Sequence, residues 1–163
     1  MTPYQNILNN EPISIDEKCD NFEDEIILVE NIKNTFLLLL GKAFEKYGPE
    51  IDKNQQVLLS LSDLAIEAYL SESTLKRTIK NINRTSLEDQ YDQINMTKLY
   101  IYEACQIVMK KSNDVINSII DQENQDKIYN SIINKLKYRK NPNVFELKTK
   151  IADKIISENK YCF

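Results

Sequence analysis

Histidine is absent from this chain of 163 residues, and glycine is nearly so, with only Gly41 and Gly48. Without histidine, the chain cannot build a histidine-ligated zinc or iron site, a Ser-His-Asp triad or a Cys-His dyad from its own residues. Two glycines cannot form a glycine-rich loop that cradles a phosphate group. With four prolines and no tryptophan, the chain also has little turn chemistry for an all-β or alternating β-α fold. This scarcity of turn residues favours long helices.

The chain also lacks an excess of positive charge. Its net charge is -4 and its pI is near 5.0, whereas a general nucleic-acid binder needs a basic face to neutralise phosphates. One local basic run spans residues 135–140. It is typical of a helix C-terminus, where cations complement the exposed carbonyls, and contact with an anionic surface is the alternative. Nucleic acid is therefore not an expected partner.

Cysteines and long apolar runs are also scarce. Cys19, Cys105 and Cys162 are scattered and form no CxxC pair, which fits a reducing cytoplasm and predicts that Cys105 is a small core residue. No segment reaches the roughly 18 apolar residues that cross a bilayer, and the N-terminus has no apolar signal core. The sequence predicts a cytoplasmic protein without a transmembrane segment and leaves peripheral membrane contact open.

The pattern of the chain predicts one all-α domain over residues 22–163, preceded by a polar tail or linker over residues 1–21. A hydrophobic fraction of 42% with 28% charged residues is typical of a folded globular domain. We expect an up-down antiparallel bundle of about five helices. Their predicted ranges are 22–47, 50–81, 87–120, 125–138 and 143–158.

Local signals set the ends of these helices. Gly48 and Pro49 end the first, Ser86 is the predicted N-cap of the third, and Asn143 with Glu146 forms a capping-box-like start of the last. On the first helix, one predicted inner stripe recurs at three- and four-residue steps. It consists of Phe22, Ile26, Val29, Lys33, Phe36, Leu40, Ala43 and Tyr47. On the third helix, the positions predicted to face inward are Ile94, Ile101, Cys105, Val108, Val115 and Ile119.

Several apolar residues do not fit a single inner stripe. One explanation is that the helices wrap one another and bury more than one face; the other is that this surface packs on another protein unit. The residues are Ile27 and Leu38 on the first helix, Leu59, Ile66 and Leu70 on the second, and Met96, Tyr100 and Ile107 on the third.

Four segments resemble the extra C-terminal domain of very-long-chain-type acyl-CoA dehydrogenases. They are FLLLLGKAFEKYG at 36–48, IDKNQQVLLSLSDLAIEAY at 51–69, ESTLKRT at 72–78 and the terminal KIADKIISENKYCF at 150–163, supported by Ala104-Cys105. The resemblance covers about residues 22–163. It implies a helical domain that follows a catalytic unit and packs on it, and that is associated with dimer geometry or membrane contact.

The resemblance also implies that catalysis lies elsewhere. In that family the catalytic unit binds FAD and uses a glutamate to remove a proton from an acyl-CoA, and these regions have no counterpart in the sequence. We therefore predict no catalytic, cofactor-binding or metal-binding residue in this chain, with FAD belonging to the full-length family. Glu67, Glu72 and Glu103 lie on predicted helices, where surface or helix-pair charge is the simpler interpretation of each.

Two functions follow as hypotheses. The first is a C-terminal accessory domain for docking or oligomerisation in an FAD-dependent acyl-CoA dehydrogenase of fatty-acid β-oxidation, as a split subunit or a gene remnant. The second is a free-standing helical interaction module unrelated to acyl-CoA oxidation. The expected partner is accordingly the acyl-CoA dehydrogenase catalytic unit, or a second copy bound through apolar helix faces.

Overall fold

The computed structural model describes residues 22–82 and 91–159, and every regular element within them is a helix. This confirms the predicted all-α fold class. The predicted tail over residues 1–21 and the predicted cap at Ser86 lie outside the described residues. The elements are α2 (Glu23–Tyr47), the 3₁₀ helix η2 (Gly48–Lys53), α3 (Gln55–Ile82), α4 (Tyr91–Ile119), α5 (Gln122–Lys135) and α6 (Val144–Glu158).

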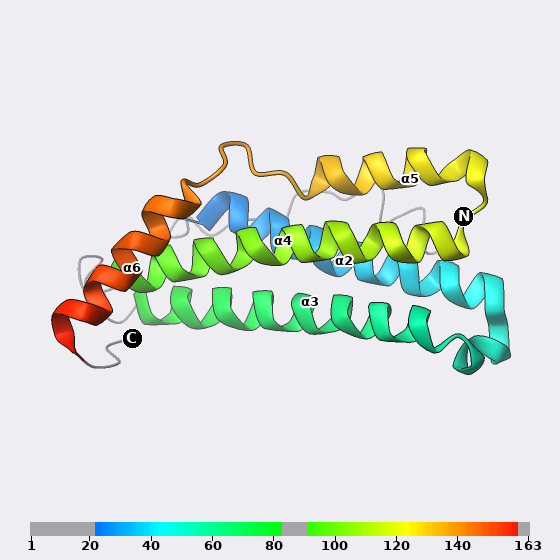
Figure 1. The fold of residues 1–163 in the computed structure, drawn as a ribbon, viewed down its shortest axis with the longest axis horizontal. Helices are drawn as coiled ribbons and strands as arrows, with labels where there is room; N and C mark the ends of the chain where they lie inside the picture. Colours follow the sequence, from blue (N-terminus) through cyan, green and yellow to red (C-terminus); the bar gives the residue numbers. More distant parts are fainter. Residues whose placement is uncertain (1–21, 83–90, 160–163) are drawn as a thin grey trace.

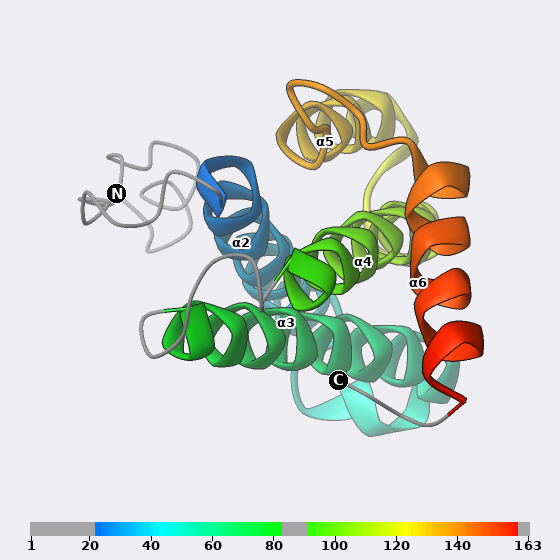
Figure 2. The ribbon, with the colours of Figure 1, turned by 90° about the vertical axis from the view of Figure 1, so that its left-hand side faces the viewer.

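The first four α-helices run up and down beside one another, as predicted (Figure 1). The contacts of α4 with α3, of α2 with α3 and of α2 with α4 are the most extensive, and α5 lies mainly on α4. The last helix, α6, contacts only α4 among the described elements and crosses the end of the bundle at a steep angle (Figure 2). The described chain is therefore a four-helix bundle with one helix added at its end.

The core of this bundle follows the helical period of α4. All six positions predicted to face inward on this helix are buried. Each fully buried aliphatic side chain contributes about 1.5–3 kcal/mol relative to an exposed one, so this helix anchors the fold. The six residues are Ile94, Ile101, Cys105, Val108, Val115 and Ile119.

On α2 the predicted inner stripe was partly wrong. The centre of the buried face is Leu28, Ile32 and Leu39, whereas the predicted Phe36 and Leu40 are only half-buried. Because α2 contacts α3, α4 and α5, it buries a broad arc of its surface. The predicted stripe followed one edge of that arc.

Three helix boundaries also differ from the prediction by three residues or more, one of them the start of the fourth helix, which lies at Gln122 and not at residue 125. The second helix does not begin at residue 50, because the chain first forms the 3₁₀ helix η2 after Gly48, whose φ of 52° ends α2. The fourth helix ends at Lys135 and not at residue 138. The chain leaves the helix there, with Leu136 buried in the core and the Tyr138 hydroxyl 3.3 Å from the carbonyl oxygen of Lys98.

None of the helices within residues 22–82 and 91–159 combines the length and apolarity that a membrane span requires.

Candidate docking surfaces and an adjacent charged cavity

Glu72, one of the three carboxylates that the sequence placed on predicted helices, joins α3 to α2. Its Oε1 atom lies 2.7 Å from the Nζ atom of Lys76 and 3.1 Å from the Nζ atom of Lys33 on α2. Hydrogen bonds from Lys76 and Lys33 hold the pKa of Glu72 below its ordinary value. The side chain is thus a stable carboxylate in a helix-helix ion pair, which is a poor environment for a general base.

Glu67 and Glu103 are held in a similar way. The Tyr100 hydroxyl donates a hydrogen bond to Glu67 over 3.1 Å, and burial together with this carboxylate raises the pKa of Tyr100 to about 12. Glu103 forms an ion pair of 2.6 Å with Lys148 of α6. The three carboxylates lie on different helical turns and form no common site.

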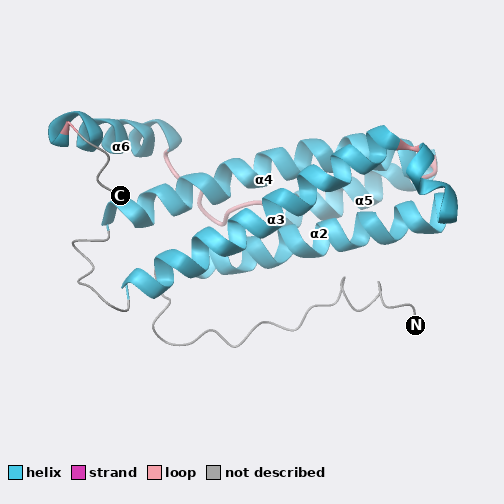
Figure 3. Cartoon of the chain, turned by 90° about the horizontal axis from the view of Figure 1, so that it is seen from below, coloured by secondary structure: helices cyan, strands magenta, loops and turns pink. Residues whose placement is uncertain are grey.

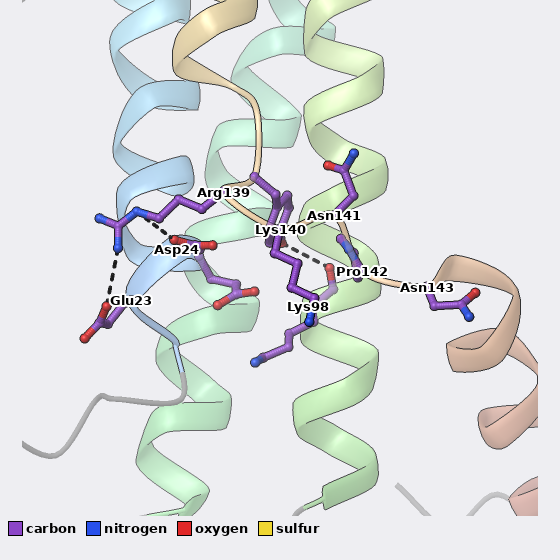
Figure 4. Close-up of a pocket in the computed structure, with 10 residues that line it drawn as sticks. Glu23, Asp24, Lys98, Arg139, Lys140, Asn141, Pro142 and Asn143 are labelled. Atoms are coloured by element: carbon purple, nitrogen blue, oxygen red, sulfur yellow. Dashed lines mark hydrogen bonds and ion pairs between the residues drawn. The ribbon is translucent and has the colours of Figure 1, made fainter.

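A cavity of about 460 Å³ opens where the start of α2, the N-terminal part of α4 and the connection from α5 to α6 meet (Figure 4). The sequence did not indicate it. Its walls carry charges of both signs from segments far apart in the chain. The lining residues are Glu23, Asp24, Glu25, Lys98, Tyr138, Arg139, Lys140, Asn141, Pro142 and Asn143.

The mouth of the cavity shows what the basic run does. The Arg139 guanidinium lies 3.4 Å from Asp24 and 3.6 Å from Glu23, in the first turn of α2 (Figure 4). At the end of α5, the Asn31 amide donates a hydrogen bond of 2.8 Å to the Lys135 carbonyl oxygen. Arg139 therefore joins the connection after α5 to the first turn of α2, and the Asn31 amide joins the end of α5 to the same helix. Lys137 and Lys140 are exposed, and their contact with an anionic surface stays a prediction.

Glu25 lies at the inner wall of the cavity and is 3% exposed. Burial raises the pKa of its carboxyl group, and the nearby Lys98 ammonium and a hydrogen bond with Tyr138 oppose that shift. Burial and the same carboxylate raise the pKa of the Tyr138 phenol. The burial of Glu25 could have been predicted from the sequence, because Glu25 lies three residues after Phe22 and four before Val29, on the same apolar side of the helix.

The cavity and the core behind it offer little for catalysis. Cys105 lies in the core, where burial, with a smaller effect of Glu25, raises the pKa of its thiol to about 12. Cys105 therefore stays protonated at neutral pH and is a weak nucleophile. Within residues 22–82 and 91–159, no three Cys, Asp or Glu side chains cluster as a metal ion would require. The arrangement holds three segments together, and its chemistry is that of a structural charge cluster.

The outer face of α3 carries the apolar line that the sequence singled out as surplus. Leu59, Ile66 and Leu70 are 66%, 52% and 41% exposed. Their steps of seven and four residues place them on one side of the helix. Figure 1 shows α3 along the lower edge of the bundle, with no described helix beyond it, and Figure 3 views the bundle from that side. We call this line the α3 stripe.

The last helix is exposed on most of its surface. No residue of α6 with a described side chain is buried, and only Val144, Leu147, Ile151 and Lys154 are half-buried. Phe145 and Ile156 are 85% and 75% exposed and lie eleven residues, or three turns, apart on the outer side. Phe145 and Ile156 define the α6 face, which the sequence did not single out.

The first helix divides its surplus apolar residues between two environments. Ile27 is exposed, as are Leu37 and Phe44. Leu38, predicted to project away from the main stripe, instead turns towards α5 and lines a groove of about 640 Å³ with Ile128. Leu38 is therefore covered by a second helix of the bundle, as the first alternative predicts. Ile27 lies on the outer surface, as the second alternative predicts.

Comparison with known proteins gives consistent results. A family model described as the acyl-CoA dehydrogenase C-terminal domain matches residues 31–135. A probable acyl-CoA dehydrogenase of Bacillus subtilis (strain 168) is 28% identical over 141 residues, which are 85% of this chain and 23% of the relative. A crystal structure of an acyl-CoA dehydrogenase complexed with FAD from Bacillus anthracis is 25% identical, with a TM-score of 0.86 over 96% of this chain and 26% of that one.

The chain thus spans about a quarter of the length of these relatives. The comparisons confirm the resemblance to acyl-CoA dehydrogenases that the sequence predicted. They do not distinguish the very-long-chain type, which stays a prediction.

Proposed function

Because the chain belongs to the acyl-CoA dehydrogenase C-terminal domain family, we propose that it is a non-catalytic accessory domain that docks on the FAD-binding catalytic unit of such an enzyme. The reaction of that enzyme would be the oxidation of a fatty acyl-CoA in β-oxidation. In this arrangement the catalytic unit carries the cofactor and the substrate. The present domain contributes a packing surface.

The observation that carries this proposal is the α6 face. A helix of 15 residues is marginal in water by itself, and α6 gains only half-buried contacts from α4. Phe145 and Ile156 nevertheless present large apolar side chains outwards. A second protein surface over them would stabilise α6. The relatives are about four times longer than this chain, and we propose that the remainder of their sequence corresponds to the unit that would supply this surface.

The charged cavity does not fit the cofactor of the family. Glu23, Asp24 and Glu25 line it together with Lys98, Arg139 and Lys140, so the formal charges balance and leave no excess of positive charge for the pyrophosphate of a dinucleotide. We therefore assign none of these residues to FAD and derive no step through it.

Binding to a catalytic unit tests the proposal. The full chain would be co-expressed with the acyl-CoA dehydrogenase catalytic unit of the same genome, and the complex would be detected by co-elution of the chain with the flavin absorbance. We expect Phe145→Asp to weaken binding at least about tenfold, because a charge would be buried against an apolar surface.

Leu59→Asp on the α3 stripe is the matched control, since it also places a carboxylate at an exposed apolar position. It should leave binding unchanged. Failure of the unmodified chain to co-elute, or equal binding by the Phe145→Asp variant, would contradict the proposal.

A further inference from the structure

The connection between α5 and α6, residues 136–143, is held in place mainly by side chains. Among the residues that the structure describes, no backbone–backbone hydrogen bond involves residues 137–142. Leu136 is buried in the core at the start of the connection, and Arg139 reaches Asp24 and Glu23 through ion pairs at the cavity mouth. Residues 137–142 can therefore leave the bundle without breaking a helical hydrogen bond.

Tyr138 holds the connection to two helices. Its hydroxyl lies 3.3 Å from the carbonyl oxygen of Lys98 on α4, and it also forms a hydrogen bond with the carboxyl group of Glu25 on α2. A phenol carries one hydrogen. When Glu25 is ionised, the Lys98 carbonyl and the carboxylate therefore compete for the same hydrogen.

Protonation of Glu25 supplies the missing hydrogen. The protonated carboxyl group can donate to the phenol oxygen of Tyr138, which leaves the phenol hydrogen for the Lys98 carbonyl. Both hydrogen bonds then exist together, and the carboxyl group, only 3% exposed, carries no charge. Ionisation instead leaves one acceptor without a donor and a charge inside the cavity wall, and each costs free energy.

The other groups around Glu25 do not remove this cost. Burial is the largest influence on the pKa of Glu25 and raises it; the Lys98 ammonium lowers it, and Asp24 raises it. The ionised carboxylate is thus incompletely compensated while the cavity is closed. The titratable groups that face it are Glu23 and Asp24 of α2, Lys98 and Cys105 of α4, and Tyr138, Arg139 and Lys140 of the connection.

We infer that Glu25 and Tyr138 form a proton-controlled latch, which keeps the connection to α6 on the bundle when Glu25 is protonated and loosens it when Glu25 ionises. In the open state Tyr138 moves away from the Lys98 carbonyl, and water reaches the carboxylate. The latch belongs to the chain alone, so it does not depend on docking on a catalytic unit.

Cys105 is a natural probe of the open state. It is 0% exposed, and it lies near enough to Glu25 for the carboxylate to affect the pKa of its thiol. The full chain would be treated with 4,4′-dithiodipyridine, and peptide mass spectrometry would follow Cys105 separately from the other two cysteines. Comparison of variants at the same pH cancels the pH dependence of the thiol itself and of the Arg139 ion pairs.

The Glu25→Gln variant imitates the protonated latch, because an amide N–H can donate to the Tyr138 oxygen. At neutral pH, Cys105 of the unmodified chain should react at least about threefold faster than Cys105 of this variant. In acid the two rates should be equal. Low concentrations of urea should not change the rate in the unmodified chain, because a local opening exposes little surface.

Two further variants separate the latch from a general effect of substitution. Tyr138→Phe should speed up the reaction of Cys105 in acid, where the phenol otherwise satisfies both partners. Glu72→Gln is the matched control, since it neutralises a carboxylate that joins α3 to α2 far from the cavity. It should react as the unmodified chain does at both pH values.

Equal rates for the unmodified chain and Glu25→Gln at neutral pH would overturn the inference, as would a difference that persists in acid. A rate that rises with urea in parallel with global unfolding would also reject it, because Cys105 would then react only when the whole bundle unfolds. The same holds if Tyr138→Phe reacts like the unmodified chain in acid.

Discussion

Glu25 has an environment unlike that of the other acidic residues of α2's first turn. Glu23 is exposed and Asp24 half-exposed at the cavity mouth, where both meet Arg139. Glu25 is buried beside Lys98 and Tyr138. A charge in such a place costs free energy unless its partners replace the lost hydration. The raised pKa of Glu25 indicates that they replace it incompletely.

The Glu25→Gln variant should be more stable than the unmodified chain at neutral pH, by on the order of 1 kcal/mol. Because the folded-state pKa of Glu25 lies above its unfolded value, its stabilising contribution is present below the unfolded pKa and is lost as pH rises through the folded pKa. Glutamine removes that loss. The measurement is urea unfolding at several pH values between acid and neutral.

The advantage of Glu25→Gln should shrink on acidification, when the native carboxyl group is protonated. Glu23→Gln, at an exposed position in the same turn, is the control and should show no such trend. A less stable Glu25→Gln variant at neutral pH, or a difference independent of pH, would refute this account.

At the residue scale, the sequence predicted the features that depend on near neighbours. Gly48 ends α2 with a positive φ, and Glu146 donates its backbone N–H to the Asn143 side chain, as predicted. The cavity was missed because Glu25 and Tyr138 lie far apart in the chain. Their contact depends on where α5 ends, which local pattern does not specify.

The N-cap of α6 provides a prediction for one element. The Asn143 side chain accepts a hydrogen bond of 3.3 Å from the Glu146 backbone N–H, and such a cap contributes about 1 kcal/mol. Since α6 has no buried residue among its described side chains, Asn143→Ala should fray this helix and leave the bundle folded. Amide hydrogen exchange should speed up about fivefold in α6 and be unchanged in α4.

Asn141→Ala is the matched control, because Asn141 is exposed in the connection before α6 and is not its cap. If exchange in α6 is the same in both variants, the cap does not limit the stability of this helix.

At the element scale, long periodic helices were predictable and their contacts less so. Every inner position expected on α4 is buried, because this helix packs against all the other α-helices. The inner face of α2 was placed at the edge of its buried arc, because a sequence does not say from how many sides a helix is covered. The predicted start of the second helix was wrong for a local reason, since the chain forms the 3₁₀ helix η2, with Pro49 in its first turn, before α3 begins at Gln55.

The whole molecule joins a well-packed bundle to surfaces that the bundle does not use. Helices α2, α3 and α4 share the core, and the surplus apolar residues on α3 face outwards, one of the two alternatives that the sequence allowed. The sequence also predicted the up-down order of the helices. It did not predict the direction of α6, which depends on contacts with α4 such as Lys148 with Glu103.

A pair of isoleucines on α4 tests how the whole bundle depends on its core. Ile101 is 0% exposed and Ile107 is 41% exposed, on the same helix. Ile101→Ala should lower the free energy of unfolding by about 2–5 kcal/mol, since it removes buried methyl groups and leaves a cavity between packed helices. Ile107→Ala makes the same chemical change where neighbours cover the side chain only in part, and should cost less than about 1 kcal/mol.

Urea unfolding followed by circular dichroism measures the free energy of unfolding of both variants. Because α4 contacts every other α-helix, the Ile101→Ala loss should appear as one earlier transition of the whole domain. An equal cost at the two positions would mean that α4 does not form the centre of the core.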